Sequence, residues 1–282
     1  YYLLKKKHVE FAKIGFSTAM IAIVILAPVQ ILVGDFHGLN VAHHQPVKLA
    51  AMEAVWETEK GAPLVLFAWP DQETEKNHFE ISIPKAASLL ITHEMDGEIP
   101  GLNEVDAKDR PPVPVVFFAF RIMLALGGLM LLLGLAGLYA RKKGTLYESK
   151  PLLILSVAMI PAGVIATLAG WYVVEVGRQP WLVQGLVRTV DVVSDLPASM
   201  VAFTLALFVV VYTTLFFTYI YFFRKLVLKG PMSVEECLAS LQDDGIDDDD
   251  LPATLNPAQV DVGYNKELSD YLSDNAADKG EK

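Results

Sequence analysis

A glutamate and an arginine stand at the end of a long apolar run in this sequence. Glu175 follows Trp171 by four residues and precedes Arg178 by three, and the run before them, Leu152 to Val174, is long enough to cross a bilayer. Carboxylates at such a boundary usually have a partner or a function. The spacing leaves both interpretations open: a helix-end ion pair between Glu175 and Arg178 beside interfacial tryptophans, or a carboxylate that the protein uses chemically.

An arginine and a methionine lie inside another apolar run. Arg121 is eight residues into the run that begins at Val113, which places it about 12 Å from the outer end of a helix. A charge at that depth requires an anion or a water-lined site. Met123 follows two residues later and, taken alone, is an ordinary core methionine. The two side chains are separated by about 200° around a helix, so they face different neighbours.

A lysine and a glutamate lie in a short segment that begins at Pro46, a residue suited to the first turn of a helix. The pattern after it predicts an amphipathic helix with an apolar side formed by Leu49, Met52, Val55 and Trp56. The pattern alone favours a helix on the membrane surface. Lys48 and Glu53 are five residues apart, so they point about 140° away from each other and a shared ligand must lie across the helix edge.

Four apolar runs are long enough to position these residues by crossing a membrane. The chain has 282 residues, of which 53% are hydrophobic, and this composition predicts an all-α integral membrane protein. The predicted transmembrane helices are residues 11–33, 113–140, 152–175 and 199–224. Basic clusters at Lys5–Lys7, in 141–151 and after 224 are predicted to be cytosolic, so 34–112 and 176–198 face outward.

The two ends of the chain differ from this membrane body. Residues 1–10 resemble the last turn of a preceding helix followed by a cytosolic basic turn, so we interpret the sequence as the C-terminal part of a longer one, a fragment or a split subunit. Residues 225–282 are predicted to be a disordered acidic cytosolic tail, because 14 acidic residues face three lysines from Pro231 onward. The single cysteine, Cys237, excludes an internal disulfide.

Three stretches resemble a known family. Gly170–Trp181 contains Gly-Arg-Gln-Pro-Trp and is similar to the signature of subunit I of the cytochrome bd family of quinol oxidases. Lys48–Glu57 and Pro70–Asn77 resemble two parts of that family's quinol-binding loop, and Phe120–Met123 matches a haem-binding stretch. The resemblance extends from residue 1 to about Phe223, the C-terminal half of the subunit. The short loop resembles the branch that includes cyanide-insensitive oxidases.

The resemblance implies that Lys48 and Glu53 are catalytic residues of quinol oxidation. A quinol loses two protons with its two electrons, so a carboxylate beside the ring can accept a proton. An ammonium group can hold the quinol oxygen or the anion that develops on it.

The resemblance also implies haem roles for five residues. Met123 matches the axial ligand of a low-spin haem b, and Arg121 would balance the charge of haem propionates. Glu175 matches an axial ligand of a high-spin haem, with Trp171 beside the haems and Arg178 in the same cofactor site. The implied metal ligands are therefore Met123 and Glu175.

The family further implies cofactors and partners. The cofactors are a low-spin haem b, a high-spin haem b and a haem d or further haem b. The partners are oxidase subunit II, the N-terminal helices of subunit I, ubiquinol or menaquinol, oxygen and membrane lipid, with no nucleic acid. None of the six histidines falls inside a predicted spanning helix, so the histidine ligands are expected from those N-terminal helices. The expected location is a bacterial or archaeal cytoplasmic membrane.

The implied function is a respiratory quinol oxidase that reduces oxygen to water and generates a proton gradient. Two alternatives stay open: a proton-coupled transporter that uses Arg121 and Glu175, and a non-catalytic assembly subunit without haem. A metal site at His43 and His44 is a weaker alternative, because adjacent loop residues rarely converge on one ion.

Overall fold

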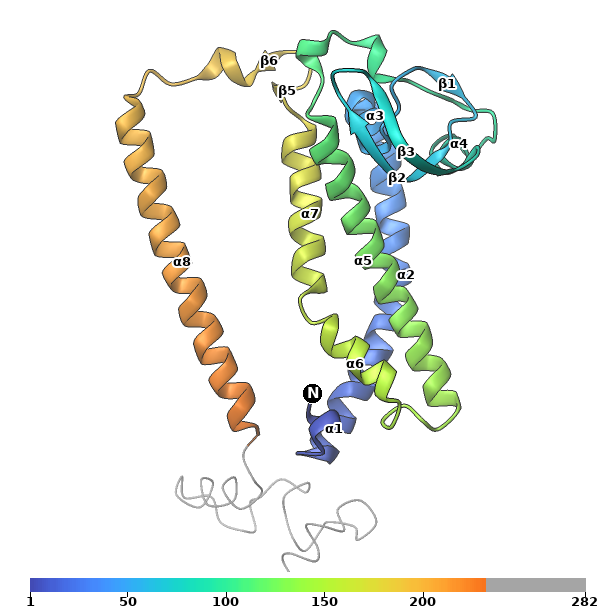
Figure 1. Cartoon of the computed structure of the whole chain (residues 1–282), viewed down its shortest axis with the longest axis vertical. Coiled ribbons are helices and arrows are strands. Elements are labelled where there is room, and N and C mark those ends of the chain that lie inside the picture. The colour runs from blue at the N-terminus through green and yellow to red at the C-terminus, as the bar shows by residue number, and fades with distance from the viewer. Residues whose placement is uncertain (232–282) are drawn as a thin grey trace, which may run out of the picture. The chain divides into compact units, whose positions relative to one another are not determined.

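The computed structural model describes residues 1–231, which fall into two units, Tyr1–Pro197 and the part that begins at Ala198 (Figure 1). Three helices are long and apolar enough to cross a membrane, and a bent helix pair raises the number to four if the pair is one span. These helices are α2 (Val9–His44), α5 (Val113–Lys142), α8 (Ala198–Lys229) and the bent pair α6 (Lys150–Ala158) and α7 (Ala162–Gly177). Of the all-α prediction, the coarser part is confirmed: the protein is mostly helical and has three or four candidate membrane-spanning helices.

Helix α2 is longer than the sequence pattern predicted. The expected end at Val33 is wrong, because the helix continues through Gly34 and Gly38 to His44 and stops at Gln45, just before Pro46. The polar residues after Val33 end the apolar run without ending the helix, since none of them removes a backbone donor as proline does. His37, His43 and His44 therefore lie within a candidate spanning helix, at its exposed C-terminal end, which corrects the expectation that no histidine does.

The predicted helix 152–175 is interrupted in the structure. Helices α6 and α7 are separated by Met159–Pro161 and bent by 41° at that break. Pro161 has no amide hydrogen and its ring clashes with the preceding turn, so the α-helical ladder cannot continue through it. The break lies in the N-terminal half of the run and leaves the end of α7, with Glu175, in one continuous helix.

The basic turns of the first unit lie at one end of its helices. A short helix α1 (Tyr2–Lys5) precedes α2 and contacts α6. Arg141, in the last turn of α5, donates a hydrogen bond from Nη2 to the Ser17 carbonyl oxygen of α2 at 3.2 Å. A hydrogen at Gly137 lets α5 approach α2, because a Cβ there would lie 2.6 Å from Met20 Sδ.

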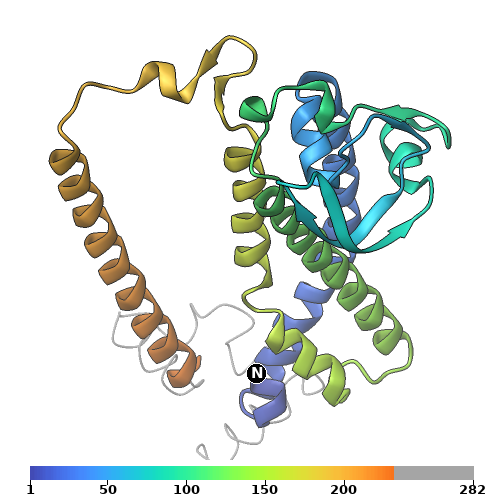
Figure 2. The same cartoon turned by 45° about the horizontal axis from the view of Figure 1, so that its top comes forward.

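The segment between α2 and α5 is not helical throughout, so the all-α prediction is wrong there. It contains α3 (Pro46–Glu53), α4 (Ala86–Thr92), an antiparallel hairpin of β2 (Leu64–Asp71) and β3 (Lys76–Ile83), a short pair of β1 (Glu59–Lys60) and β4 (Glu98–Ile99), and the 3-10 turns η1 (Leu102–Glu104) and η2 (Ala107–Asp109). Figure 2 shows these elements gathered over the C-terminal end of α2 and the N-terminal end of α5. Leu64–Asp71 forms a strand because its β-branched and aromatic residues suit a half-buried pleated surface.

Helix α3 is buried, which corrects the predicted surface helix. Residues 48–53 are all buried, and the helix ends at Glu53, so Val55 and Trp56 lie beyond it and not on it as predicted. Its small residues Ala50 and Ala51 pack in one core with Trp56 and Val65 of the loop and with Phe117 of α5. The apolar side of α3 is therefore covered by protein, and the loop is docked on the first turns of α5.

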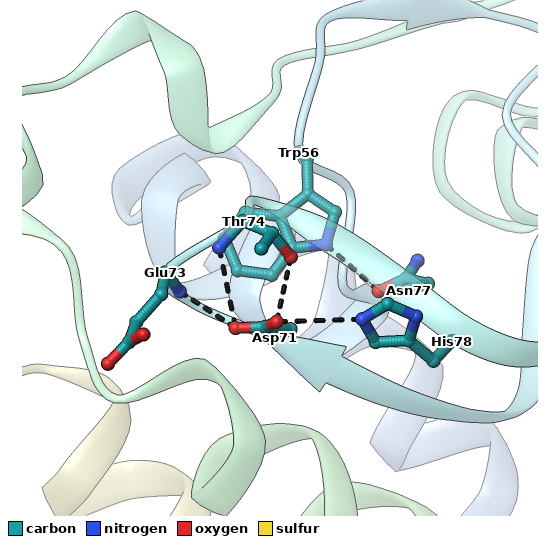
Figure 3. A network of polar contacts seen from close by, with 6 residues as sticks. All are labelled: Trp56, Asp71, Glu73, Thr74, Asn77 and His78. Atoms are coloured by element: carbon teal, nitrogen blue, oxygen red, sulfur yellow. Dashed lines mark hydrogen bonds and ion pairs between the residues drawn. The ribbon is translucent and has the colours of Figure 1, made fainter.

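The tip of the hairpin is closed by an aspartate (Figure 3). Asp71 Oδ1 accepts hydrogen bonds from the backbone amides of Glu73 at 2.9 Å and Thr74 at 3.4 Å, and Oδ2 accepts the Thr74 hydroxyl at 2.8 Å. His78 Nε2 lies 3.5 Å from Oδ2. The Thr74 hydroxyl, followed by the backbone amides, lowers the pKa of the Asp71 carboxyl group. This turn fixes a register that pairs Pro70 with Asn77.

The remaining elements follow α7. Residues 181–192 form a hairpin of β5 (Trp181–Val183) and β6 (Val187–Arg188) and a 3-10 turn, η3 (Thr189–Val192). Helix α8 carries two stacked aromatic pairs, Phe208–Tyr212 and Tyr219–Phe223, and continues to Lys229 where 224 was predicted. The predicted tail beyond Pro231, with Cys237, lies outside the described residues.

Candidate functional site

An ion pair joins the loop to the second spanning helix. Glu53, the last residue of α3, accepts a hydrogen bond through Oε2 from Arg121 Nη2 of α5 at 2.6 Å, and the two side chains are only 6% and 13% exposed. Arg121 Nε donates to the Val65 carbonyl oxygen of β2, also at 2.6 Å. The guanidinium carbon lies 4.8 Å from the centre of the Phe117 ring. Glu53 is thus the anion that the depth of Arg121 required.

This pair holds the loop firmly because neither charge can lose its partner cheaply. Removal of one member of a buried ion pair leaves the other charge uncompensated and costs about 3–5 kcal/mol. The flat guanidinium group of Arg121 binds a helix and a strand of the loop at once, which a lysine cannot do. Arg121 Nη1 is buried and has no hydrogen-bond partner within residues 1–231. One donor therefore remains for an anionic group.

Lys48 points to a different helix. Its aliphatic stem lies along Gly177 at the end of α7, where an added Cβ would meet Lys48 Cγ at 3.1 Å and Cε at 3.2 Å. Burial lowers the pKa of the Lys48 ammonium group, the positive charge of Arg178 lowers it further, and Glu175 opposes both. Because Lys48 faces α7 and Glu53 faces α5, the two side chains diverge as their spacing predicted.

Glu175 and Arg178 form the helix-end ion pair anticipated from their spacing. Arg178 Nη2 lies 2.8 Å from Glu175 Oε2, and the side chains are 38% and 40% exposed. Arg178 Nε is buried without a hydrogen-bond partner in the described part of the chain. The Gln179–Pro180 peptide bond that follows is cis. This geometry is compatible with both interpretations of Glu175, since a half-exposed pair leaves the carboxylate accessible.

Met123 lies apart from the Arg121 pair. Its sulfur would be 3.0 Å from a Cβ at Gly170, so the thioether lies against α7 one residue before Trp171. The Trp171 indole is 58% exposed and packs edge to face against Tyr172 at 5.9 Å. The structure therefore joins Glu53 to Arg121, brings Lys48 to the Glu175–Arg178 pair, and sets Met123 beside the same helix, without gathering the seven residues in one cluster.

Two side chains in separate places have donor atoms that suit haem iron. Met123 offers a thioether, which is a soft neutral donor, and Glu175 offers a carboxylate, which is a hard anionic donor. The unpartnered donors Arg121 Nη1 and Arg178 Nε can each bind an anionic group such as a propionate. No group of three or more histidine, cysteine or carboxylate side chains suited to a metal ion occurs among residues 1–231.

Sequence reasoning missed several residues that build this region. Asn77 was quoted as part of the loop stretch Pro70–Asn77 but received no role, although its side chain bonds to both Trp56 and the Ala54 carbonyl. Asp109 Oδ1 of η2 lies 2.7 Å from Arg188 Nη2 of β6, and this ion pair joins the segment before α5 to the segment after α7. The one sequence signal for the Asn77 contacts is an amide residue close to the hairpin turn. No pattern in the sequence predicts the pair of Asp109 and Arg188.

Two cavities border the site. An apolar groove of about 490 Å³ runs between α5 and α7 and ends at Trp69 of β2, with Phe118 and Tyr172 in its walls. A second cavity of about 330 Å³ lies under the hairpin and is lined by Trp56, Glu59, Asn77 and Glu80 among others. Burial, followed by the charges of Glu80 and Glu57, raises the pKa of the Glu59 carboxyl group.

Comparisons with known proteins agree on one family. A family model described as cytochrome bd terminal oxidase subunit I matches residues 1–231. The chain is 35% identical over 240 residues to cytochrome bd ubiquinol oxidase subunit 1 of Bacillus subtilis (strain 168), covering 81% of this chain and 51% of that protein. It is 28% identical over 303 residues to cytochrome bd-II ubiquinol oxidase subunit 1 of Escherichia coli (strain K12), covering 83% and 59%.

A solved structure supports the same relationship. The bd oxidase from Geobacillus thermodenitrificans matches with a TM-score of 0.67 and 29% identity, over 75% of this chain and 49% of that chain. The chain therefore spans about half the length of the relatives it matches.

Proposed function

This chain belongs to the cytochrome bd terminal oxidase subunit I family, and we propose that it supplies the quinol-oxidising loop and two haem ligands of a respiratory quinol oxidase. The activity is that of a quinol:oxygen oxidoreductase. One observation carries the proposal: the Glu53–Arg121 pair fastens the loop to α5 only two residues from Met123. The loop residue assigned to substrate is thereby fixed to the helix that carries one of the residues assigned to haem.

At the loop, Lys48 and Glu53 divide the work of quinol oxidation. A quinol that becomes a quinone gives up two electrons and two protons. Arg121 holds Glu53 Oε2 and so orients the carboxylate, whose second oxygen accepts a proton from the quinol hydroxyl. Lys48 lies on the far side of α3 from Glu53, and burial lowers the pKa of its ammonium group. In its charged form it holds the other end of the substrate.

On α5 and α7, the chain offers one ligand to each of two haems. Met123 would be the thioether ligand of a low-spin haem b, and Glu175 the carboxylate ligand of a high-spin haem, b or d. Bound there, the haems would supply electron transfer and oxygen reduction. Arg121 and Arg178 offer donors to their propionates. Trp171 lies beside this cofactor site.

The rest of the assembly is proposed from the family relationship. The N-terminal helices of subunit I supply the histidine ligands, and subunit II completes the complex. Ubiquinol or menaquinol reaches the loop on the outer side of a cytoplasmic membrane. Protons released there, and protons taken from the inside to form water, together generate the gradient.

The test is a visible spectrum of the purified complex together with quinol-driven oxygen uptake. We expect low-spin and high-spin haem bands, and we expect Glu53→Gln and Lys48→Ala to impair uptake while the bands stay. A complex without haem absorption would contradict the proposal and favour a transporter or an assembly subunit. Full uptake in both variants would return α3 to a purely structural role.

A further inference from the structure

An asparagine of the hairpin reaches the end of helix α3. Trp56 Nε1 donates a hydrogen bond to Asn77 Oδ1 at 2.9 Å (Figure 3). Asn77 Nδ2 donates to the Ala54 carbonyl oxygen at 3.0 Å. An indole nitrogen can only donate, so the amide oxygen must face Trp56 and the amide nitrogen must face Ala54. The side chain of Asn77 is therefore held in one orientation between two residues that follow Glu53.

The residue that Asn77 holds has an unusual backbone. Ala54 directly follows Glu53 and has a φ of 54°, in the left-handed region that favours glycine. The turn is closed by the Val55 amide, which donates to the Ala50 carbonyl oxygen at 2.9 Å. A left-handed alanine persists only when its surroundings fix it. The bond from Asn77 to the Ala54 carbonyl is one such restraint, and this turn sets the position of Glu53 at the helix end.

The same hairpin also restrains the partner of Glu53. Strand β2 provides the Val65 carbonyl oxygen that accepts Arg121 Nε, while β3 provides Asn77. Trp56 and Val65 lie in one buried cluster, so the two restraints share a packed base. The hairpin thus holds the carboxylate through Ala54 and the guanidinium group through Val65, and it brings both to one place.

We propose that Asn77 is a positioning residue for Glu53: by fixing the left-handed turn at Ala54, it sets the single geometry in which the Glu53 carboxylate meets Arg121 and faces the quinol. Asn77 acts through the backbone and does not touch the substrate. The inference rests on the proposed function of Glu53 and deepens it.

The decisive variant is Asn77→Asp in the assembled complex. The carboxylate keeps the shape of the side chain and an acceptor for Trp56, but it replaces the Nδ2 donor with an oxygen. That oxygen would face the Ala54 carbonyl oxygen and the Glu80 carboxylate, whose Oε2 lies 3.2 Å from Nδ2 in the wild type. We expect kcat for quinol oxidation to fall about tenfold, equivalent to about 1.4 kcal/mol in the barrier. We expect KM and the haem spectrum to stay unchanged, because the substrate pocket and the cofactors are not touched.

Two matched variants separate positioning from general loop stability. Trp56→Phe removes the donor to Asn77 Oδ1 but leaves the bond from Nδ2 to Ala54, so kcat is expected to fall less than in Asn77→Asp. Glu80→Gln keeps an acceptor beside Nδ2 and is expected to be silent. If Asn77→Asp does not assemble, Asn77→Ser provides the same comparison, since its hydroxyl is too short to reach the Ala54 carbonyl.

The outcomes are distinct. A kcat in Asn77→Asp and Asn77→Ser equal to that of the wild type overturns the inference, as does an equal loss of kcat in Trp56→Phe. A rise in KM with kcat unchanged also overturns it, because this would place Asn77 in substrate binding. A wild-type complex without haem or quinol-driven uptake instead refutes the proposed function itself.

Discussion

Two glutamate–arginine pairs in this protein have nearly the same length and opposite environments. Glu53 and Arg121 come from segments 68 residues apart, meet at 2.6 Å and are 6% and 13% exposed. Glu175 and Arg178 are one helical turn apart, meet at 2.8 Å and are 40% and 38% exposed. The first pair joins α3 of the loop to α5, and the second lies at the end of the single helix α7.

The difference in burial decides what each pair can do. Breaking a buried pair costs about 3–5 kcal/mol, because the remaining charge is left without water or partner. An exposed pair contributes about 0–1 kcal/mol, so either member can exchange its partner at little cost. The buried pair is therefore suited to holding the loop in place. In the exposed pair, the Glu175 carboxylate can leave Arg178 at little cost and bind iron, as we propose.

The largest expected effect is at the buried pair. Arg121→Gln leaves Glu53 as a buried charge without its cation and removes the bond to Val65, so we expect the loop to lose about 3–5 kcal/mol of docking free energy. Hydrogen exchange of residues 45–112 in the purified complex measures this loss, and quinol-driven uptake should fall with it. Arg141→Gln, at the other end of the same helix, is the control and should change neither. Unaltered protection of the loop in Arg121→Gln would contradict the account.

The next effect concerns Met123, which is two residues beyond Arg121 in the sequence but on another face of α5. Met123→Leu preserves volume, so the free energy of unfolding should change by less than about 1.5 kcal/mol. The low-spin haem signal should nevertheless shift to high spin or disappear, because leucine cannot bind iron. Met130→Leu on the same helix controls for packing. An unchanged low-spin spectrum would make Met123 a core residue and nothing more.

A smaller effect is expected where the loop meets the exposed pair. Gly177→Ala places a Cβ 3.1 Å from Lys48 Cγ, so the lysine stem must shift by a few tenths of an ångström. We expect a cost of about 1 kcal/mol, seen as a roughly fivefold rise in KM for quinol. Gly163→Ala, in the same helix but with no atom within 4 Å, should be silent. Identical KM values in the two variants would show that Lys48 does not depend on this contact.

The smallest effect is at the hairpin turn. Asp71 has a pKa below its ordinary value of 3.8, so its stabilising contribution is present above that pH and is lost as the pH falls through the lower, folded-state pKa. Asp71→Asn should therefore lower hairpin protection slightly at neutral pH, where the carboxylate contributes, and remove the dependence of that protection on acid pH. Hydrogen exchange of residues 64–83 from neutral to acid pH measures it. A pH dependence identical to that of the wild type would assign the effect to another group.

The contrast between the two pairs also shows what the sequence could reveal. The Glu175–Arg178 pair follows from spacing within one helix, and the divergence of Lys48 from Glu53 follows from helical geometry. The partner of Arg121 could not be predicted, because it depends on how the loop folds and no local rule links residues 68 apart. The break at Pro161 carried a visible signal, a proline inside an apolar run, that was outweighed by the length of the run.

The hairpin was harder to predict than the helices. Its strand residues match the sheet preference, yet Leu64–Asp71 lacks strict alternation, and the pairing is irregular between Val65 and Trp69. The extension of α2 to His44 was missed for a different reason. The length of the apolar run indicates only the part of α2 that can cross a membrane, whereas the helix itself continues as far as its backbone hydrogen bonds do, to His44.

The central claim is that the exposed pair frees Glu175 for iron, and one matched comparison tests it most directly. Glu175→Gln and Arg178→Gln both remove the ion pair, but only the first replaces an anionic oxygen with a neutral amide that is a poor ligand of ferric iron. The measurement is the high-spin haem content of each purified complex, read from its visible spectrum. We predict that Glu175→Gln loses a high-spin haem and oxygen reduction while the low-spin haem remains reducible by quinol, and that Arg178→Gln retains both haems. Equal loss in the two variants would contradict the claim, because it would show that the protein needs the ion pair and not a bond from Glu175 to the metal.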